Sequence, residues 1–175
     1  MIAVYFVLMM TLYGVVNGQE LSAPKVYDTD LLSKEFYHGR RTELSKKLLP
    51  NSVALLFASE QRIRSEASYY NYRFNNNLYY LTGLQEPDGA FLFIPDGISL
   101  IENGKTIYSV LFVNPRDLDK ETRNGRRFGT AGAMQVLGVD TAIVNSEFES
   151  VFKKITTQLS ASKKLDHVYL PDIYT

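Results

Sequence analysis

The sequence predicts an α/β domain in which helices flank a mixed or mostly parallel sheet. Short continuous apolar runs at 52–59 and 89–95 are typical of strands buried on both faces. Segments with helix-capping signals lie before, between and after such runs. Strands that alternate with helices in this way indicate an α/β architecture.

The first helix is expected to begin near Leu31 and to end before Pro50. Ser33 is a suitable N-cap, and Glu35 falls in the first turn, where a negative charge is favourable. Four basic residues of this segment are predicted to lie on a solvated face: Arg40, Arg41, Lys46 and Lys47.

The middle of the chain is predicted to form strands joined by turns. The polar residues 61–68 are expected to be a loop. After the strand at 89–95, the residues 95–97 read Pro-Asp-Gly, which is a turn signal. Residues 98–113 are predicted to form a hairpin, because Asn103 and Gly104 suit the two positive-φ positions of a type I′ turn.

The last third is predicted to alternate helices and strands. In order, these are a charged helix over 116–123, a helix over 133–137, a strand over 141–145, a helix over 146–159 and a strand over 165–172. Gly138 fits the position after a helix end, and Ser146 with Glu149 forms a capping box. Pro171 interrupts the final strand.

The composition excludes several kinds of chemistry. The 175 residues include no cysteine, which rules out disulfides, thiol catalysis and zinc–thiolate sites. There are only two histidines, His38 and His167. Nineteen basic and nineteen acidic residues give a net charge of zero, which argues against a nucleic-acid partner held by a broad basic surface.

The first 18 residues resemble a secretory signal peptide. They carry no charged side chain, and Val16 and Gly18 are small residues suited to a cleavage site after Gly18. We therefore expect a secreted or periplasmic protein, with a linker over 19–30 and a domain over 31–175. The alternative is a membrane anchor, although the run of about 15 apolar residues is shorter than the roughly 20 that span a bilayer.

The residues do not form a recognisable catalytic motif. Glu86 and Asp88 are the only close acidic pair in a suggestive context, and Pro87 between them favours a turn. The glycines of 125–138 lack the lysine of a phosphate loop, so tight turns are their expected use. No catalytic residue and no metal ligand is predicted in this chain.

Two ordered blocks resemble the N-terminal domain of the aminopeptidase P (Xaa-Pro aminopeptidase, creatinase/prolidase-like) family. The first block comprises Arg64-Ser65, Tyr72-Arg73-Phe74, Asn75 to Asn77, Leu78-Tyr79-Tyr80-Leu81-Thr82-Gly83 and Glu86-Pro87-Asp88. The second comprises Leu111-Phe112, Arg116-Asp117, Glu121, Gly125, Arg127 and Gly129. The resemblance covers about 31–172, and the order and spacing of both blocks make it specific.

The resemblance implies a ribonuclease-H-like (creatinase N-terminal) fold and a place in a two-domain, oligomeric enzyme. In that family a C-terminal pita-bread domain binds two divalent cations, usually Mn²⁺, and removes an N-terminal residue that precedes proline. None of its metal ligands maps onto this chain, so the catalytic domain is an expected partner, and proline-containing peptides are expected ligands of the full enzyme only. The family tryptophan, which in bacterial members lies near the neighbouring subunit's active site, is Arg123 here. A guanidinium there puts direct substrate contact by this loop in doubt.

The stretch 72–88 is predicted to be a structural joint. Four of its side chains are expected to pack between the sheet and the helices: Tyr72, Tyr79, Tyr80 and Leu81. Arg73 is expected to pair with Glu86 or Asp88, and Thr82-Gly83 to end a short helical turn. The alternative is a rim facing the catalytic domain or another subunit. The structural and interface candidates are Arg73, Tyr79, Tyr80, Glu86, Asp88, Arg123 and Arg127.

Three functions remain open from the sequence. The first is a non-catalytic domain of a Mn²⁺-dependent Xaa-Pro metalloaminopeptidase that shapes access to the active site and supports homo-oligomerisation. The second is a stand-alone interaction or dimerisation module with a tyrosine-rich face. The third, a nuclease, rests on fold analogy alone, which does not carry function.

Overall fold

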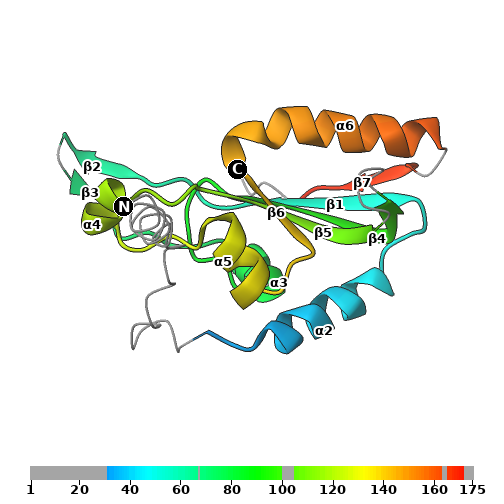
Figure 1. Cartoon of the computed structure of the whole chain (residues 1–175), viewed down its shortest axis with the longest axis horizontal. Helices are drawn as coiled ribbons and strands as arrows, with labels where there is room; N and C mark the ends of the chain where they lie inside the picture. Colours follow the sequence, from blue (N-terminus) through cyan, green and yellow to red (C-terminus); the bar gives the residue numbers. More distant parts are fainter. Residues whose placement is uncertain (1–30, 67, 100–104, 163–164, 172–175) are drawn as a thin grey trace, which may run out of the picture. The chain divides into compact units, whose positions relative to one another are not determined.

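A five-stranded mixed sheet lies at the centre of the domain (Figure 1). The computed structural model describes residues 31–66, 68–99, 105–162 and 165–171. The elements are α2 (Lys34–Ser45), β1 (Ser52–Phe57), β2 (Ile63–Ser65), β3 (Ser68–Tyr69), α3 (Asn76–Thr82), β4 (Ala90–Ser99), β5 (Thr106–Val113), α4 (Leu118–Asn124), α5 (Gly129–Val136), β6 (Thr141–Val144), the 3-10 turn η2 (Asn145–Glu147), α6 (Phe148–Ala161) and β7 (His167–Tyr169).

The strand order is β6-β5-β4-β1-β7. Strand β4 is antiparallel to both β1 and β5, whereas β6 is parallel to β5 and β7 is parallel to β1. Four strands therefore run in one direction and β4 runs in the other. As a result, the ends of β1, β5 and β6 lie at the same edge of the sheet as the start of β4.

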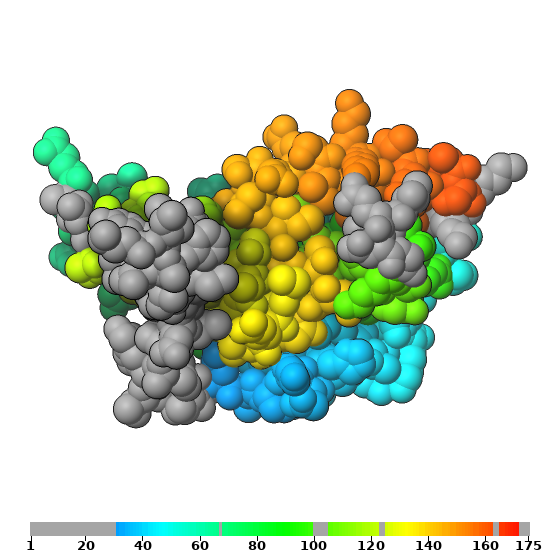
Figure 2. Space-filling view, in the orientation of Figure 1, coloured from blue at the N-terminus to red at the C-terminus, as the bar shows by residue number. Residues whose placement is uncertain are grey.

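Helices cover both faces of this sheet. Ile155 and Leu159 of α6 pack on one face, against a cluster that includes Val53, Leu92 and Phe112. On the other side of the sheet lie α2, α3 and α5 (Figure 1). Figure 2 shows α6 and α2 along opposite sides of one view, with the α5–β6 region between them. The predicted mixed sheet flanked by helices is confirmed.

Local signals explain where two helices begin and end. The Ser33 side chain accepts a hydrogen bond from the Phe36 N–H, as its predicted N-cap role requires. In α3 the Asn75 side chain accepts from the N–H groups of Asn77 and Leu78. Gly83 ends this helix with φ 78°, a left-handed conformation that favours glycine. The predicted helical turn ending at Thr82-Gly83 is thus confirmed.

Two turn and loop predictions are wrong. Part of 61–68 is not a loop, because β2 and β3 form a small antiparallel hairpin in which the Ser65 and Ser68 hydroxyls lie 2.7 Å apart. All of the residues in these two strands are exposed, so the sequence there lacks the alternation of apolar and polar residues that indicates a half-buried strand. The predicted turn at 95–97 lies inside β4, where a register shift between Phe93 and Ile98 accommodates Pro95 and Gly97.

Two helix predictions also need correction. Ser146 does not cap α6, because it belongs to the 3-10 turn η2 and the helix begins at Phe148 without a side-chain cap. Arg41 does not lie on a solvated face, since it is 3% exposed. Its guanidinium donates to the carbonyl of Leu81 at 2.9 Å and to that of Gly138, so it joins α2 to the ends of α3 and α5.

Several predictions lie outside the described residues. These are the signal peptide over 1–18, the linker over 19–30 and the turn at Asn103-Gly104. The two arms of that hairpin, β4 and β5, are antiparallel as predicted. Within the described ranges, no helix combines the length and apolar character needed to cross a bilayer.

Candidate functional site

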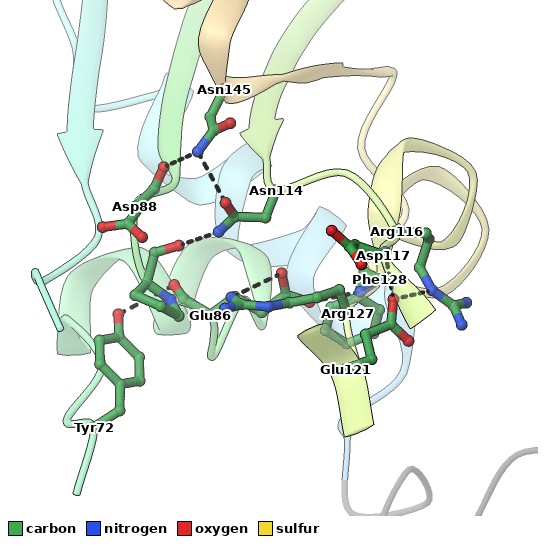
Figure 3. Close-up of polar contacts among 11 residues, drawn as sticks. Tyr72, Glu86, Asp88, Asn114, Arg116, Asp117, Glu121, Arg127, Phe128 and Asn145 are labelled. Atoms are coloured by element: carbon green, nitrogen blue, oxygen red, sulfur yellow. Dashed lines mark hydrogen bonds and ion pairs between the residues drawn. The ribbon is translucent and has the colours of Figure 1, made fainter. Parts of the chain in front are cut away.

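Polar side chains gather at the sheet edge where β1, β5 and β6 end and β4 begins (Figure 3). Asn114 directly follows β5, and Asn145 directly follows β6. The turn Glu86-Pro87-Asp88 leads into β4. Such strand ends are where α/β proteins commonly place binding groups, so this edge is the candidate functional site.

Two asparagine side chains hold the turn before β4. The Asn114 side-chain amide donates to the carbonyl of Pro87 at 2.8 Å. That of Asn145 donates to the carbonyl of Asp88 at 3.0 Å and to the Asn114 side-chain oxygen at 3.2 Å. Asp88 itself has φ 59°, a left-handed conformation uncommon outside glycine. The asparagine contacts stabilise this strained turn.

A tyrosine hydroxyl fixes the other side of the same turn. Tyr72 donates its hydroxyl to the carbonyl of Glu86 at 3.1 Å. Burial raises the pKa of Tyr72, and the Asp88 carboxylate raises it further, so the hydroxyl keeps its proton for this bond. Tyr72 therefore fixes the turn through its hydroxyl, and its packing between sheet and helices stays a prediction.

Glu86 is the buried acid of the site. It is 7% exposed, and its Oε1 accepts from the Phe128 N–H at 2.6 Å. The other oxygen, Oε2, lies 3.7 Å from the Arg127 guanidinium and has no hydrogen-bond partner among the described residues. Burial raises the pKa of Glu86, and the Phe128 N–H and Arg127 offset this only in part. The carboxyl group joins the turn before β4 to the start of α5.

A second carboxylate organises the loop between β5 and α4. Glu121 Oε1 accepts from the Arg116 side chain at 2.6 Å and from the Asp117 N–H at 3.1 Å. Burial, the largest single influence, acts to raise the pKa of Glu121, but the bonds from Arg116 and the Asp117 N–H together lower it. The pKa of Glu121 is thus shifted in the opposite direction to that of Glu86.

A glycine allows the two loops to approach each other closely. Gly129, the first residue of α5, has φ 61°. A Cβ at this position would lie 2.7 Å from Cγ of Arg116. Any larger residue would therefore push the Arg116 side chain away from its Glu121 partner.

The structure brings together three of the seven predicted candidates: Glu86, Asp88 and Arg127. The predicted pairing of Arg73 with Glu86 or Asp88 is wrong, because Arg127 is the arginine that faces Glu86. Arg73 is exposed and lines a separate polar cleft of about 820 Å³ with Arg62. Both arginines suited Glu86 chemically, and only the fold decides between them.

The two tyrosine candidates, Tyr79 and Tyr80, belong to α3, outside these contacts. Tyr79 is half-buried against the Phe74 ring, with the ring centroids 4.6 Å apart, as a packing role requires. Tyr80 is 48% exposed, so its predicted packing between sheet and helices is wrong. Arg123 belongs to α4.

The sequence reasoning missed Asn114, Asn145 and the Arg116–Glu121 pair as site residues. A signal for the asparagines existed, because each directly follows a strand of the sheet, and the strand before Asn114 is mostly buried. Among the described residues, no three histidine, aspartate or glutamate side chains are grouped to hold a metal ion. The observed geometry can fix turns and join the loops at this edge of the sheet.

Comparison with known proteins identifies a family that matches most of the domain. The family described as "Aminopeptidase P, N-terminal domain" matches residues 37–164. A Xaa-Pro aminopeptidase from Haemophilus influenzae is 37% identical over 144 residues, which are 82% of this chain and 31% of that protein. One from Escherichia coli is 38% identical over 117 residues, or 66% of this chain and 25% of that protein. The chain thus spans a quarter to a third of these relatives.

Solved structures give the same result. Aminopeptidase P from E. coli with the inhibitor Pro-Leu is similar with a TM-score of 0.63 and 34% identity, over 83% of this chain and 30% of that chain. A low-pH form of the E. coli protein has a TM-score of 0.60 and 35% identity, over 71% of this chain and 27% of that chain. The predicted fold is therefore confirmed, and the chain belongs to the aminopeptidase P N-terminal domain family.

Proposed function

We propose that this chain acts as the non-catalytic N-terminal domain of a Mn²⁺-dependent Xaa-Pro metalloaminopeptidase. The observation that carries the proposal is the match of nearly the whole described domain to one part of such enzymes. Release of an N-terminal residue before proline, with two Mn²⁺ ions, would then belong to a catalytic domain that acts as this chain's partner. The chain itself would contribute no metal ligand.

In this proposal, the hydrogen-bonded turn and loops at the end of β1, β5 and β6 shape access to the active site of the catalytic domain. Tyr72, Asn114 and Asn145 donate hydrogen bonds to the turn before β4, and Glu86 ties this turn to the residue before α5. A rigid wall positions a peptide better than a mobile loop does. Proline-containing peptides are the substrates that such a wall would position.

Fusion to a relative's catalytic part tests the proposal. The full chain is fused ahead of the part of the H. influenzae enzyme that lies beyond the match, and release of alanine from Ala-Pro-Pro with Mn²⁺ is compared with that of the catalytic part alone. We expect about tenfold faster release, or more, from the fusion, as a positioning effect of about 1.4 kcal/mol gives. Equal rates would contradict an access-shaping role.

We further propose that the domain supports homo-oligomerisation, and exposed apolar side chains on the β2–β3 hairpin support this. Ile63, Tyr69 and Tyr70 are 71%, 58% and 56% exposed. Isolated tyrosines are ordinary on a surface, but neighbouring large apolar groups favour an interface. The same feature favours the second candidate function, a stand-alone interaction module. Light scattering on the lone chain tests whether it dimerises without a catalytic domain, and a monomer at all concentrations would contradict both roles of this surface.

Export is also a proposal, supported by the uncharged first 19 residues. Expression in a bacterial host followed by fractionation and N-terminal sequencing tests it. We expect a periplasmic product that begins at Gln19. A full-length product retained in the membrane fraction would indicate the anchor instead.

A further inference from the structure

An apolar groove of about 390 Å³ lies on the α2 side of the sheet, next to β7. Leu44 and Leu48 form one wall, and Ala54 and Leu56 of β1 contribute to its base. Tyr169, the last residue of β7, and the two residues after it, Leu170 and Pro171, also line the groove. The groove is thus bounded by a helix on one side and by the sheet edge on the other.

The side chains around this groove are unusually apolar for an exposed surface. Tyr80 is 48% exposed, Tyr169 is 36% exposed and Leu170 is 63% exposed. Ala54 and Leu56, by contrast, are already buried at 5% and 9% exposure. Several large exposed apolar groups around a preformed hollow indicate a surface that another element covers.

The sheet edge beside the groove is also open. Strand β7 pairs with β1 and, within the described ranges, with no second strand. Tyr169, the residue of β7 that lines the groove, is 36% exposed. An exposed apolar edge strand favours pairing or coverage by another part of a protein. The sheet edge beside the groove is therefore open to another element.

The rim of the groove is basic. Arg40 and Lys47 line it, and the one acidic residue there, Glu43, is paired with Lys46 at 2.6 Å. The Arg40 guanidinium lies 4.6 Å from the centre of the Phe36 ring and 5.0 Å from that of Tyr80, so aromatic faces hold it in place. An occupant with apolar side chains flanked by carboxylates would complement this surface.

The geometry points to an amphipathic helix of the metallopeptidase catalytic domain as the occupant of this groove. Such a helix would lie beside α2 on the sheet face, with apolar residues at i, i+3, i+4 and i+7 in the groove and acidic residues at the rim. It would complete the helical layer, because one helix beside α2 covers the open end of the sheet.

The length of the relatives beyond the match supports this occupant. The match covers 31% of the H. influenzae enzyme, which leaves about two thirds of that protein to supply the helix. The inference rests on the proposed function, since it takes the catalytic domain as the partner.

Hydrogen–deuterium exchange tests this inference on the full chain, alone and fused to the catalytic part of the H. influenzae enzyme. We expect amides of 45–49 and 167–170 to exchange about tenfold more slowly in the fusion, because docking suppresses local opening. Leu170→Asp should remove this protection. The matched control is Leu118→Asp, which changes a 62% exposed leucine of α4 outside the groove and should leave the protection intact.

Three results would overturn the inference. They are equal exchange in the lone chain and the fusion, protection that Leu170→Asp does not reduce, and protection in the lone chain that grows with its concentration, which would identify a second copy as the occupant. Peptide release by the fusion separates this inference from the proposed function. Faster release without groove protection contradicts only the docking, whereas protection without faster release contradicts only the access-shaping role.

Discussion

The Oε1 atom of Glu86 accepts a hydrogen bond from the Phe128 N–H at 2.6 Å, although the two residues are 42 positions apart in the sequence. This contact ties the turn that begins β4 to the residue that precedes α5. Backbone N–H groups at a helix start lack partners within the helix, so a carboxylate there stabilises it. The two blocks of sequence that carry the family resemblance thus meet at one hydrogen bond.

Replacing Glu86 should destabilise the domain strongly. Glu86→Ala leaves the Phe128 N–H and the Arg127 guanidinium without their acceptor, at a cost of about 2–4 kcal/mol in the free energy of unfolding. Urea unfolding followed by circular dichroism measures this. Glu60→Ala, a change at an exposed acid, is the control and should stay within about 0.5 kcal/mol. A Glu86→Ala protein as stable as the control would show that the contact is unimportant.

The two buried carboxyl groups should respond to pH in opposite ways. Burial raises the pKa of Glu86, so its stabilising contribution is full below its unfolded pKa and is lost as the pH rises through its folded pKa. The pKa of Glu121 is lowered, despite burial, by Arg116 and the Asp117 N–H. Its contribution is present above the unfolded pKa and is lost as the pH falls through the folded pKa.

Glutamine variants separate these effects. Relative to wild type, Glu86→Gln should be more destabilising at pH 4 than at pH 7, and Glu121→Gln should be more destabilising at pH 7 than at pH 4. Urea unfolding at the two pH values gives both differences. The same pH trend in both variants would contradict the assignment of opposite shifts.

Arg41 should be essential for stability even though it belongs to a helix rich in basic residues. Arg41→Ala leaves the carbonyl groups of Leu81 and Gly138 without their donor, which should cost about 2–4 kcal/mol. Arg41→Lys should recover only part of this, because an ammonium group lacks the forked geometry. Thermal unfolding compares these variants with His38→Ala on the exposed side of α2, and equal melting temperatures for Arg41→Ala and His38→Ala would contradict this role.

Two glycines should give opposite results when changed to alanine. Gly83 has φ 78°, and a Cβ there would lie 2.6 Å from the buried Tyr37 ring, so Gly83→Ala should destabilise by about 2–4 kcal/mol. Gly39 lies within α2 with open space around it, so Gly39→Ala should stabilise by about 0.5–1 kcal/mol. Denaturant unfolding of both variants measures the two changes in the free energy of unfolding. A change of the same sign in both variants would contradict the prediction.

Much of the fold was predictable because local patterns determine it. The apolar run of β1, the Ser33 cap and the left-handed positions of Gly83 and Gly138 are properties of neighbouring residues. The β2–β3 hairpin was not predictable, because its exposed residues show no periodic burial. Pro95 and Gly97 suggested a turn, but a shift in pairing inside β4 accommodates both.

The site was less predictable than the fold because its contacts join distant segments. The sequence predicts a positively charged partner for Glu86, and Arg73 and Arg127 are equally suitable by residue type. The fold places Arg127 beside Glu86. Arg41 looked like one of several solvated charges, whereas it faces the ends of two other helices. In both cases tertiary packing, and not local sequence, decides which charge is buried.

The most direct test of the account is an Ala-Pro-Pro release assay on the lone full chain with added Mn²⁺. The central claim is that this domain is a scaffold whose buried acids fix turns and perform no hydrolysis. We predict no release of alanine above the rate in buffer, for wild type and Glu86→Gln alike. Mn²⁺-dependent release that scales with the concentration of the chain, and that Glu86→Gln abolishes, would contradict the claim.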